Sequence, residues 1–351
     1  MNRLYMLDIA RGLAAISIGI FHYKIFYAHN LSVNTYILEN QPYYNYISLV
    51  YNYGWIAVQF FFLLSGFIFF KLYMKKIYEK KISFYNFAVL RISRLYPLHF
   101  ITLIIVLLIY FLLNNNNFQN PIRADLEHFI YNLFLIHEWG LSKFSSFNEP
   151  SWSISVELLM YLIFFYIALR TKIIFLSLLI ILLSSILFFK FKLLGYGGYC
   201  FFVGGLSYII FENIKINQKN KIIFFLIVIF ISFFLLISFD YNSIIIKIIL
   251  LTFFFPSLIN LLYLINKLSP QIGKKLSLIG DVSYSFYLIH FPIILITILI
   301  QSHLKLKINF DSNLIFWLYM IVTFLISFFS YRFIEIPLKK ILRQKFIKND
   351  Q

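Results

Sequence analysis

The first candidate for chemistry is an arginine and a histidine inside the first apolar run of the chain. Arg11 and His22 are eleven residues apart, close to three helical turns, so both side chains point to one side, about 16 Å apart along the axis. Asp8 precedes Arg11 by three residues, a spacing that allows an ion pair. Ionisable groups within a membrane span usually mark a functional site. The alternative is a structural ion pair and a histidine bonded to a neighbouring helix.

A second candidate is a pair of arginines one helical turn apart. Arg91 and Arg94 are followed by Tyr96 and Pro97. Two guanidinium groups at this spacing suit a phosphate or pyrophosphate, which they hold through paired hydrogen bonds beside an aromatic ring. The alternative is ordinary anchoring of cationic side chains at the inner membrane surface.

A third candidate group opens a later apolar run with Trp152, Ser153, Glu157 and Tyr161. Trp152 stands where an aromatic belt is expected. Glu157 lies about five residues inside the boundary, roughly 8 Å deep, where a carboxylate favours a catalytic or cation-binding role. We expect Glu157 and His22 to converge on one cavity. The serines lack the glycine pattern of a nucleophile elbow, and no motif indicates a metal site.

A fourth group marks an unusually polar start of a membrane helix. Tyr287 and His290 follow Asp281 and Ser283, and Pro292 comes two residues after His290. The proline is expected to free a backbone carbonyl or to kink the helix near His290. A hydrogen-bonded core histidine beside a packing kink is the alternative interpretation.

The composition indicates which elements must position these groups. Of 351 residues, 61% are hydrophobic and 13% charged, which leaves too little polar surface for a soluble globule. One membrane crossing takes roughly 20 apolar residues, so we predict an all-α, polytopic membrane protein. About ten transmembrane helices are expected, at 6–28, 55–73, 96–113, 152–169, 173–190, 194–212, 222–239, 243–265, 283–302 and 313–334.

The cations predict the orientation. With the N-terminus inside, inner segments hold 22 of the 31 Lys and Arg residues, so both termini are predicted to be cytoplasmic. The net charge of +17 is then explained by topology and by contact with membrane lipids rather than by nucleic acid. Residues 1–351 are expected to form one membrane domain, with a basic interfacial helix at 74–95, an outer loop at 114–151 and a short cytoplasmic tail at 335–351.

At this point the sequence resembles the integral-membrane acyltransferase-3 family, whose members O-acylate bacterial surface polysaccharides. The resemblance lies in an ordered set of motifs that extends over about 290 residues: LDIARG at 7–12 followed by His22, FFFLLSGF at 60–67, RxxRLYP at 91–97, SWSISVE at 151–157 and GDVSYSFYLIHxP at 280–292. Each motif alone is weak evidence for this family, whereas the complete set in this order is specific for it.

The resemblance implies an enzyme of the bacterial cytoplasmic membrane that moves an acyl group, commonly acetyl, from coenzyme A to a sugar hydroxyl outside. Family roles imply that Arg11 and His22 are catalytic-site residues and that Arg91 and Arg94 contact acetyl-CoA. The acceptor is expected to be a polysaccharide or its lipid-linked precursor. Because no SGNH-type domain follows the last span, transfer is expected from the membrane part alone or with a separate extracytoplasmic transferase.

The residues allow one mechanism and leave two alternatives. We expect His22 to act as the base, either activating the sugar hydroxyl directly or carrying the acyl group. Glu157 is expected to orient His22, and Tyr161, Tyr287 and His290 are expected to line the cavity, with Asp8, Trp152 and Ser153 nearby. The alternatives are a transporter or flippase that uses the same ionisable groups as a relay, and a polysaccharide polymerase.

Overall fold

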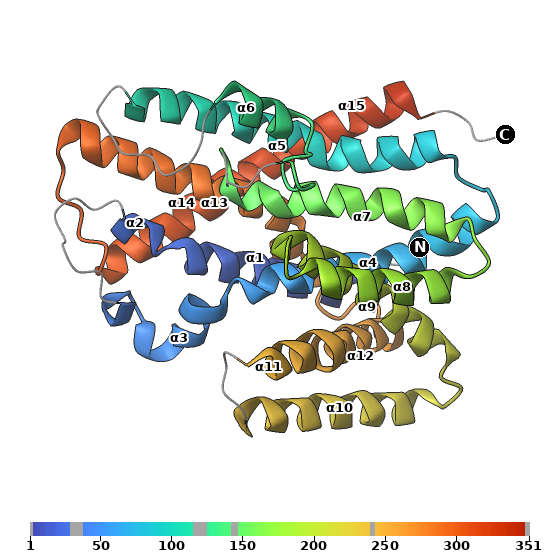
Figure 1. The fold of residues 1–351 in the computed structure, drawn as a ribbon. Helices are drawn as coiled ribbons and strands as arrows, with labels where there is room; N and C mark the ends of the chain where they lie inside the picture. Colours follow the sequence, from blue (N-terminus) through green and yellow to red (C-terminus); the bar gives the residue numbers. More distant parts are fainter. Residues whose placement is uncertain (1–2, 29–37, 115–124, 142–146, 239–242, 348–351) are drawn as a thin grey trace.

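A computed structural model describes residues 3–28, 38–114, 125–141, 147–238 and 243–347, and within these ranges the chain forms helices and no strands. The longer helices pack side by side along one direction (Figure 1). Their bounds are α1 Tyr5–His22, α2 Ile25–Ala28, η1 Leu38–Asn40, α3 Tyr44–Tyr53, α4 Ile56–Tyr78, α5 Phe84–Asn114, α6 Leu126–Leu133, η2 Glu149–Ser151, α7 Trp152–Ala168, α8 Ile173–Leu187, α9 Lys192–Asn213, α10 Gln218–Ser238, α11 Ile244–Ile249, η3 Leu250–Phe254, α12 Phe255–Leu268, η4 Lys274–Leu276, α13 Ser277–Leu304, α14 Asn313–Ser330, η5 Tyr331–Glu335 and α15 Ile336–Phe346.

The helices confirm the predicted class of a multi-pass, all-α membrane protein. Among the described residues, nine helices are long and apolar enough to cross a membrane. The remaining expected span corresponds to α8, an apolar helix of 15 residues, about 22 Å long. Helices suit this environment because they satisfy their backbone hydrogen bonds internally, where no water can replace them.

The predicted interfacial helix at 74–95 does not form as a separate element. The segment is instead divided between the end of α4 at Tyr78 and the start of α5 at Phe84, and α5 continues through Pro97. With 31 residues, α5 is about 46 Å long, longer than the roughly 30 Å hydrocarbon core. Its first turns can therefore extend beyond the hydrocarbon and keep their cations in the interface. A separate helix on the membrane surface is therefore not needed to hold these cations in the interface.

Glycines allow the site-bearing helices to pack closely. Gly280 of α13 lies against α1, where a Cβ atom would meet the backbone of Asp8; Gly12 of α1 faces Ile279 in the same way. Gly66 of α4 has the same relation to the backbone of Phe201 in α9. Small residues at such crossings let helix backbones approach closely in membranes. The α1–α13 contact therefore fixes how the functional side chains of these two helices face each other.

The segment before α7 packs against α13. Within the expected outer loop, residues 125–141 and 147–151 are described and contain α6 and η2, whereas 115–124 and 142–146 lie outside the described residues. Asn148 donates from Nδ2 to the carbonyl of Leu288 at 3.1 Å. Leu288 lies four residues before Pro292, so this is the carbonyl that the proline leaves without its helical partner. The expected freed carbonyl is confirmed, and the loop satisfies it.

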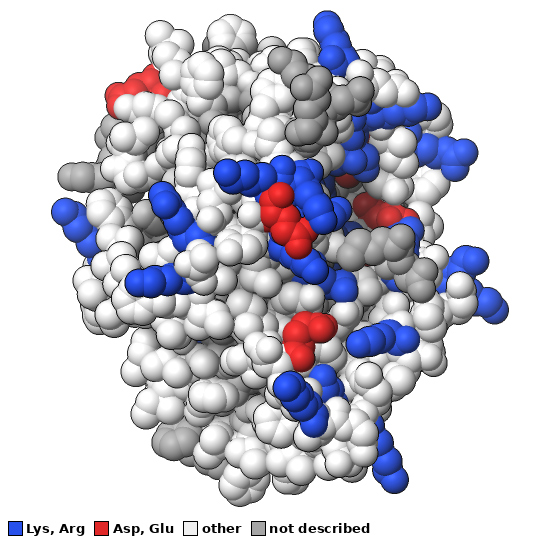
Figure 2. Space-filling model, turned by 90° about the vertical axis from the view of Figure 1, so that its right-hand side faces the viewer, with Lys and Arg blue, Asp and Glu red and all other residues white. Residues whose placement is uncertain are grey.

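One end of the bundle presents a face rich in Lys and Arg side chains (Figure 2). The start of α1 and the end of α15 lie at this same end (Figure 1). Viewed from there, Lys and Arg side chains are spread over the face and outnumber the acidic ones (Figure 2). This distribution agrees with the predicted cytoplasmic orientation of both termini. Residues 348–351 of the expected tail lie outside the described residues.

Candidate active site

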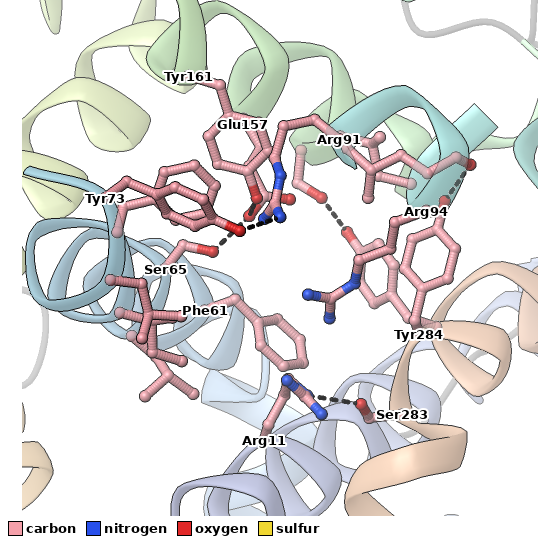
Figure 3. Close-up of a pocket in the computed structure, with 18 residues that line it drawn as sticks. Arg11, Phe61, Ser65, Tyr73, Arg91, Arg94, Glu157, Tyr161, Ser283 and Tyr284 are labelled. Atoms are coloured by element: carbon pink, nitrogen blue, oxygen red, sulfur yellow. Dashed lines mark hydrogen bonds between the residues drawn. The ribbon is translucent and has the colours of Figure 1, made fainter. Parts of the chain in front are cut away.

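A pocket with a cavity volume of about 190 Å³ lies between α1, α4, α5, α7 and α13. Charged and aromatic side chains converge on it from all five helices (Figure 3). The residues that line it are Arg11, Phe61, Leu64, Ser65, Ile68, Phe69, Leu72, Tyr73, Arg91, Arg94, Leu95, Ser153, Ile154, Glu157, Tyr161, Ser283, Tyr284 and Tyr287. The structure thus brings together seven residues that the sequence indicated on four separate segments: Arg11, Arg91, Arg94, Ser153, Glu157, Tyr161 and Tyr287.

Arg11 links α1 to the start of α13. Its Nε donates to Ser283 Oγ at 2.9 Å, and its Nη2 donates to the Gly280 carbonyl at 2.9 Å and to Asp8 at 3.0 Å. The expected ion pair between Asp8 and Arg11 is therefore present. Asp8 also accepts from Arg3 at 2.8 Å. Because Nε and Nη2 are engaged, the two N–H groups of Nη1 are the ones that Arg11 retains for a ligand in the pocket.

The two arginines of α5 differ in their contacts. Arg91 is 8% exposed, donates to the Tyr73 hydroxyl at 2.7 Å, and stacks over the rings of Phe69 and Tyr73 at about 5 Å. Arg94 forms no hydrogen bond or salt bridge with any residue that the structure describes. Its guanidinium group points into the open centre of the pocket (Figure 3). Five N–H donors of fixed charge are therefore available to an anion.

Glu157 does not contact His22. Its Oε1 accepts hydrogen bonds from Ser65 of α4 and from Tyr161, one turn further along α7. These partners hold the carboxylate against the wall of the pocket near Arg91 (Figure 3). The expectation that Glu157 orients His22 is wrong, because the α7 face that carries Glu157 packs toward α4 and α5 rather than toward α1.

His22 is paired instead with His290. Nδ1 of His22 lies 2.9 Å from Nε2 of His290, and the rings are stacked. Nδ1 of His290 lies 3.2 Å from the Phe286 carbonyl, which can only accept. With both rings neutral, His290 therefore carries its proton on Nδ1 and accepts from His22 through Nε2. His22 donates from Nδ1, and its Nε2 keeps a lone pair available to accept a proton.

A layer of side chains separates the histidine pair from the arginine pocket. Neither histidine lines the pocket. Tyr287 stands between them, with its ring 6.0 Å from that of His290 and 5.8 Å from that of Phe61. The Tyr287 hydroxyl donates to the Pro150 carbonyl and bonds Ser153 Oγ, both at 2.7 Å. Phe61 and Tyr287, the latter held by Ser153, thus form a partition between the pocket and His290.

Besides Asp8 and the two histidines, two more expected site residues, Tyr96 and Trp152, lie outside the pocket. Tyr96, expected beside the phosphate-binding arginines, stacks on Phe100 one turn further along α5. Trp152 packs beside Phe62, with ring centroids 6.0 Å apart. Tyr96 follows Arg94 by two residues, which turns its side chain by about 200° around α5 and away from the cavity.

Other pocket residues were given no site role from the sequence, although several lie within the motifs FFFLLSGF and GDVSYSFYLIHxP. On α4, Phe61, Ser65, Phe69 and Tyr73 recur every fourth residue and line one wall. This spacing places them on one face of a helix, so it is a signal that could have indicated a functional wall. The Tyr284 hydroxyl donates to the Leu95 carbonyl at 2.5 Å and joins α13 to α5.

The fold and pocket define a polytopic membrane protein with a cationic cavity at one end and an imidazole pair deeper in the bundle. A family model described as an acyltransferase domain, that of the acyltransferase-3 family, matches residues 4–332. The chain belongs to this family and is a multi-pass membrane acyltransferase. No curated protein and no solved structure matches it significantly.

Proposed function

We propose that the protein transfers an acyl group, most simply acetyl, from cytoplasmic acyl-coenzyme A to a hydroxyl of a cell-surface polysaccharide or of its lipid-linked precursor. The observation that carries the proposal is Arg94, whose guanidinium group has no hydrogen-bond or salt-bridge partner among the described residues and points into a pocket that Arg11 and Arg91 also line. Such a group calls for an anionic ligand. In a family of acyltransferases, the anionic ligand of this chemistry is the phosphorylated acyl donor.

The donor is bound by its phosphates. Arg94 and the free N–H groups of Arg91 and Arg11 hold the pyrophosphate, and the Tyr73 ring packs beside it. The pantetheine arm then extends from Arg11 toward His22, a distance of about 16 Å along α1. The acyl end passes the partition when the Phe61 or Tyr287 side chain rotates away.

Transfer uses the proton-accepting nitrogen of His22. Nε2 of His22 takes the proton of the sugar hydroxyl while the hydroxyl oxygen attacks the thioester carbonyl carbon. The C–S bond of the tetrahedral intermediate then breaks, and the thiolate takes the proton from His22, so that free coenzyme A leaves and the base is regenerated. His290 is a positioning residue, because it fixes the tautomer of His22.

The acceptor approaches from the end of the bundle opposite the charged face. Lys24, just after α1, interacts electrostatically with His22 and with Glu149 of η2, which immediately precedes α7. We place the protein in the bacterial cytoplasmic membrane, where it acts alone or passes the acyl group to a separate extracytoplasmic transferase.

The test follows label from acetyl-CoA into cell-surface glycan in membranes that contain the wild-type protein. We expect labelled O-acetyl glycan and an equal amount of free coenzyme A thiol. Arg94→Ala should lower transfer at least tenfold by loss of charge-assisted hydrogen bonds, and His22→Ala should abolish it. Ile92→Ala, a substitution of an exposed residue on the same helix, is the matched control. Undiminished transfer by the His22→Ala protein would remove the proposed base.

A further inference from the structure

The C-terminal helix α15 lies against α5, beside the two arginines of the pocket. Arg343 of α15 donates from Nε to Ser93 Oγ at 3.1 Å and from Nη2 to the Leu90 carbonyl at 3.2 Å. Ser93 and Leu90 are neighbours of Arg94 and Arg91 in α5. Arg343 thus reaches the turn of α5 that carries the pocket arginines. Three of its five N–H donors are not used in these bonds.

Lys339 lies one turn before Arg343 and so shares its side of α15. Its charge interacts with those of Glu335, Arg94 and Arg343. Lys339 forms no hydrogen bond or salt bridge with any residue in the described ranges. The next residue, Lys340, is exposed and is rotated by about 100° around the helix.

Three cations from two helices therefore gather at the charged end of the bundle. In the part of the chain that the structure describes, no carboxylate lies within salt-bridge distance of any of these three cations, Arg94, Lys339 and Arg343. Like charges on neighbouring helices repel each other, and a multivalent anion relieves that repulsion. α15 ends on the side of the bundle (Figure 1) whose face is rich in Lys and Arg (Figure 2).

The span that contains α15 is also long enough to place these cations outside the hydrocarbon. Helical residues Asn313–Phe346 number 34, which corresponds to about 51 Å, against a hydrocarbon thickness of roughly 30 Å. The last turns of α15 therefore project toward the aqueous side, where a charged nucleotide can reach them.

We propose that Lys339 and Arg343 bind the 3′-phosphate of the coenzyme's adenosine, so that α15 selects coenzyme A over donors that lack this phosphate. The inference rests on the proposed function. When the pantetheine arm occupies the pocket and the pyrophosphate lies at Arg91 and Arg94, the adenosine extends outward along α5. The cations of α15 are the next charged groups on that path.

The test compares acetyl-CoA with acetyl-dephospho-CoA, which differs only in lacking the 3′-phosphate. For the wild-type protein we expect kcat/KM to be about tenfold or more higher with acetyl-CoA, the effect of one charge-assisted contact. Lys339→Gln should reduce this preference toward one by acting only on acetyl-CoA. Lys340→Gln, on the adjacent side of α15, should leave the preference intact.

Arg343 also joins α15 to α5. The effect of Arg343→Gln alone would therefore combine loss of the charge with loss of this contact. Arg343→Lys keeps the charge and should retain more of the preference than Arg343→Gln. Inhibition gives a second readout: adenosine 3′,5′-bisphosphate should compete with acetyl-CoA at least tenfold better than AMP, and only in proteins with Lys339.

Equal use of both donors by the wild-type protein, or an unchanged preference in Lys339→Gln, would overturn the proposal about α15 and leave the acyl-CoA reaction standing. Absence of acyl transfer from either donor would instead overturn the proposed function. The two failures are therefore distinguishable.

Discussion

The imidazole of His290 decides which nitrogen of His22 can accept a proton. We expected the Glu157 carboxylate to orient His22. Glu157 instead accepts hydrogen bonds from Ser65 and Tyr161, and His290 is the partner of His22. The sequence indicated that Arg11, His22, Glu157 and His290 matter, since each is an ionisable group in an apolar run. It did not indicate which of them touch. Partner choice depends on the rotation of each helix about its axis relative to its neighbours, which no spacing within one helix determines.

Removing the acceptor on His290 should impair catalysis without breaking the fold. In His290→Leu, His22 loses the partner that fixes its Nδ1 proton, and we expect acyl transfer to fall at least tenfold, in the range known for loss of an orienting partner, up to about 10⁴. His290→Gln supplies an amide oxygen that can accept from Nδ1 and should recover part of the rate. The pH profile of kcat/KM should shift in His290→Leu. Equal rates for the Leu and Gln variants would contradict the tautomer assignment.

Glu138 makes a pH-dependent contribution to stability outside the membrane spans. Burial raises the pKa of Glu138 from 4.5 to about 7. The folded state therefore binds a proton that the unfolded state releases between these values, and the stability of the fold decreases as the pH rises from about 4.5 to about 7. Glu138→Gln should raise the melting temperature in detergent at pH 8 and change it little at pH 4.5. A larger gain at pH 4.5 than at pH 8 would contradict this sign.

At the scale of single helices, the positions of the spans were predicted more accurately than the segments that connect them. Apolar runs fixed the positions of nearly every span, since the hydrocarbon demands about 20 apolar residues each time. The segment 74–95 was assigned wrongly because basic amphipathic patterns fit a surface helix and also the protruding end of a long span. Pro97 did not decide between them: proline interrupts a helix in water, whereas neighbouring helices compensate for it in a membrane.

The α1–α13 crossing should be sensitive to one methyl group. In Gly280→Ala, the added Cβ would overlap the Asp8 backbone, so α13 must move away and the bond from Arg11 to the Gly280 carbonyl lengthens. Overpacking of this kind costs about 1–3 kcal/mol, and we expect a lower melting temperature together with reduced acyl transfer. Ser277→Ala is the control on the same helix, because the Ser277 hydroxyl donates to the nearby Lys274 carbonyl at an exposed position. A fully active, equally stable Gly280→Ala protein would show that the crossing is not tightly constrained.

At the scale of the whole molecule, the main functional feature is that the two ends of the helix bundle differ in their charged groups. The cationic pocket and α15 belong to one end, and the contact between Asn148, in the segment before α7, and Leu288 of α13 belongs to the other. Composition and cation distribution predicted this polarity from the sequence. They could not predict the partition formed by Phe61 and Tyr287, because it arises from side chains on two helices that are far apart along the chain.

Cysteine labelling can test the orientation, because the native Cys200 is buried and should remain unreactive in the folded protein. Lys305→Cys, between α13 and α14, should react with a membrane-impermeant maleimide in intact cells. Lys215→Cys, between α9 and α10, should react only after permeabilisation. Both positions are exposed, so accessibility differs only by side of the membrane. The reverse pattern would invert the assigned topology and place the pocket outside.

The guanidinium of Arg94, which has no partner in the described part of the chain, has a consequence for regulation in the cell. If it binds the donor through phosphate, as proposed, its contact is the same whether the thiol carries an acetyl group or is free. Spent coenzyme should then compete with fresh donor at nearly equal affinity. Surface modification would follow the cytoplasmic ratio of acetylated to free coenzyme rather than the donor concentration alone, so that the decoration of the envelope would record the metabolic state of the cell.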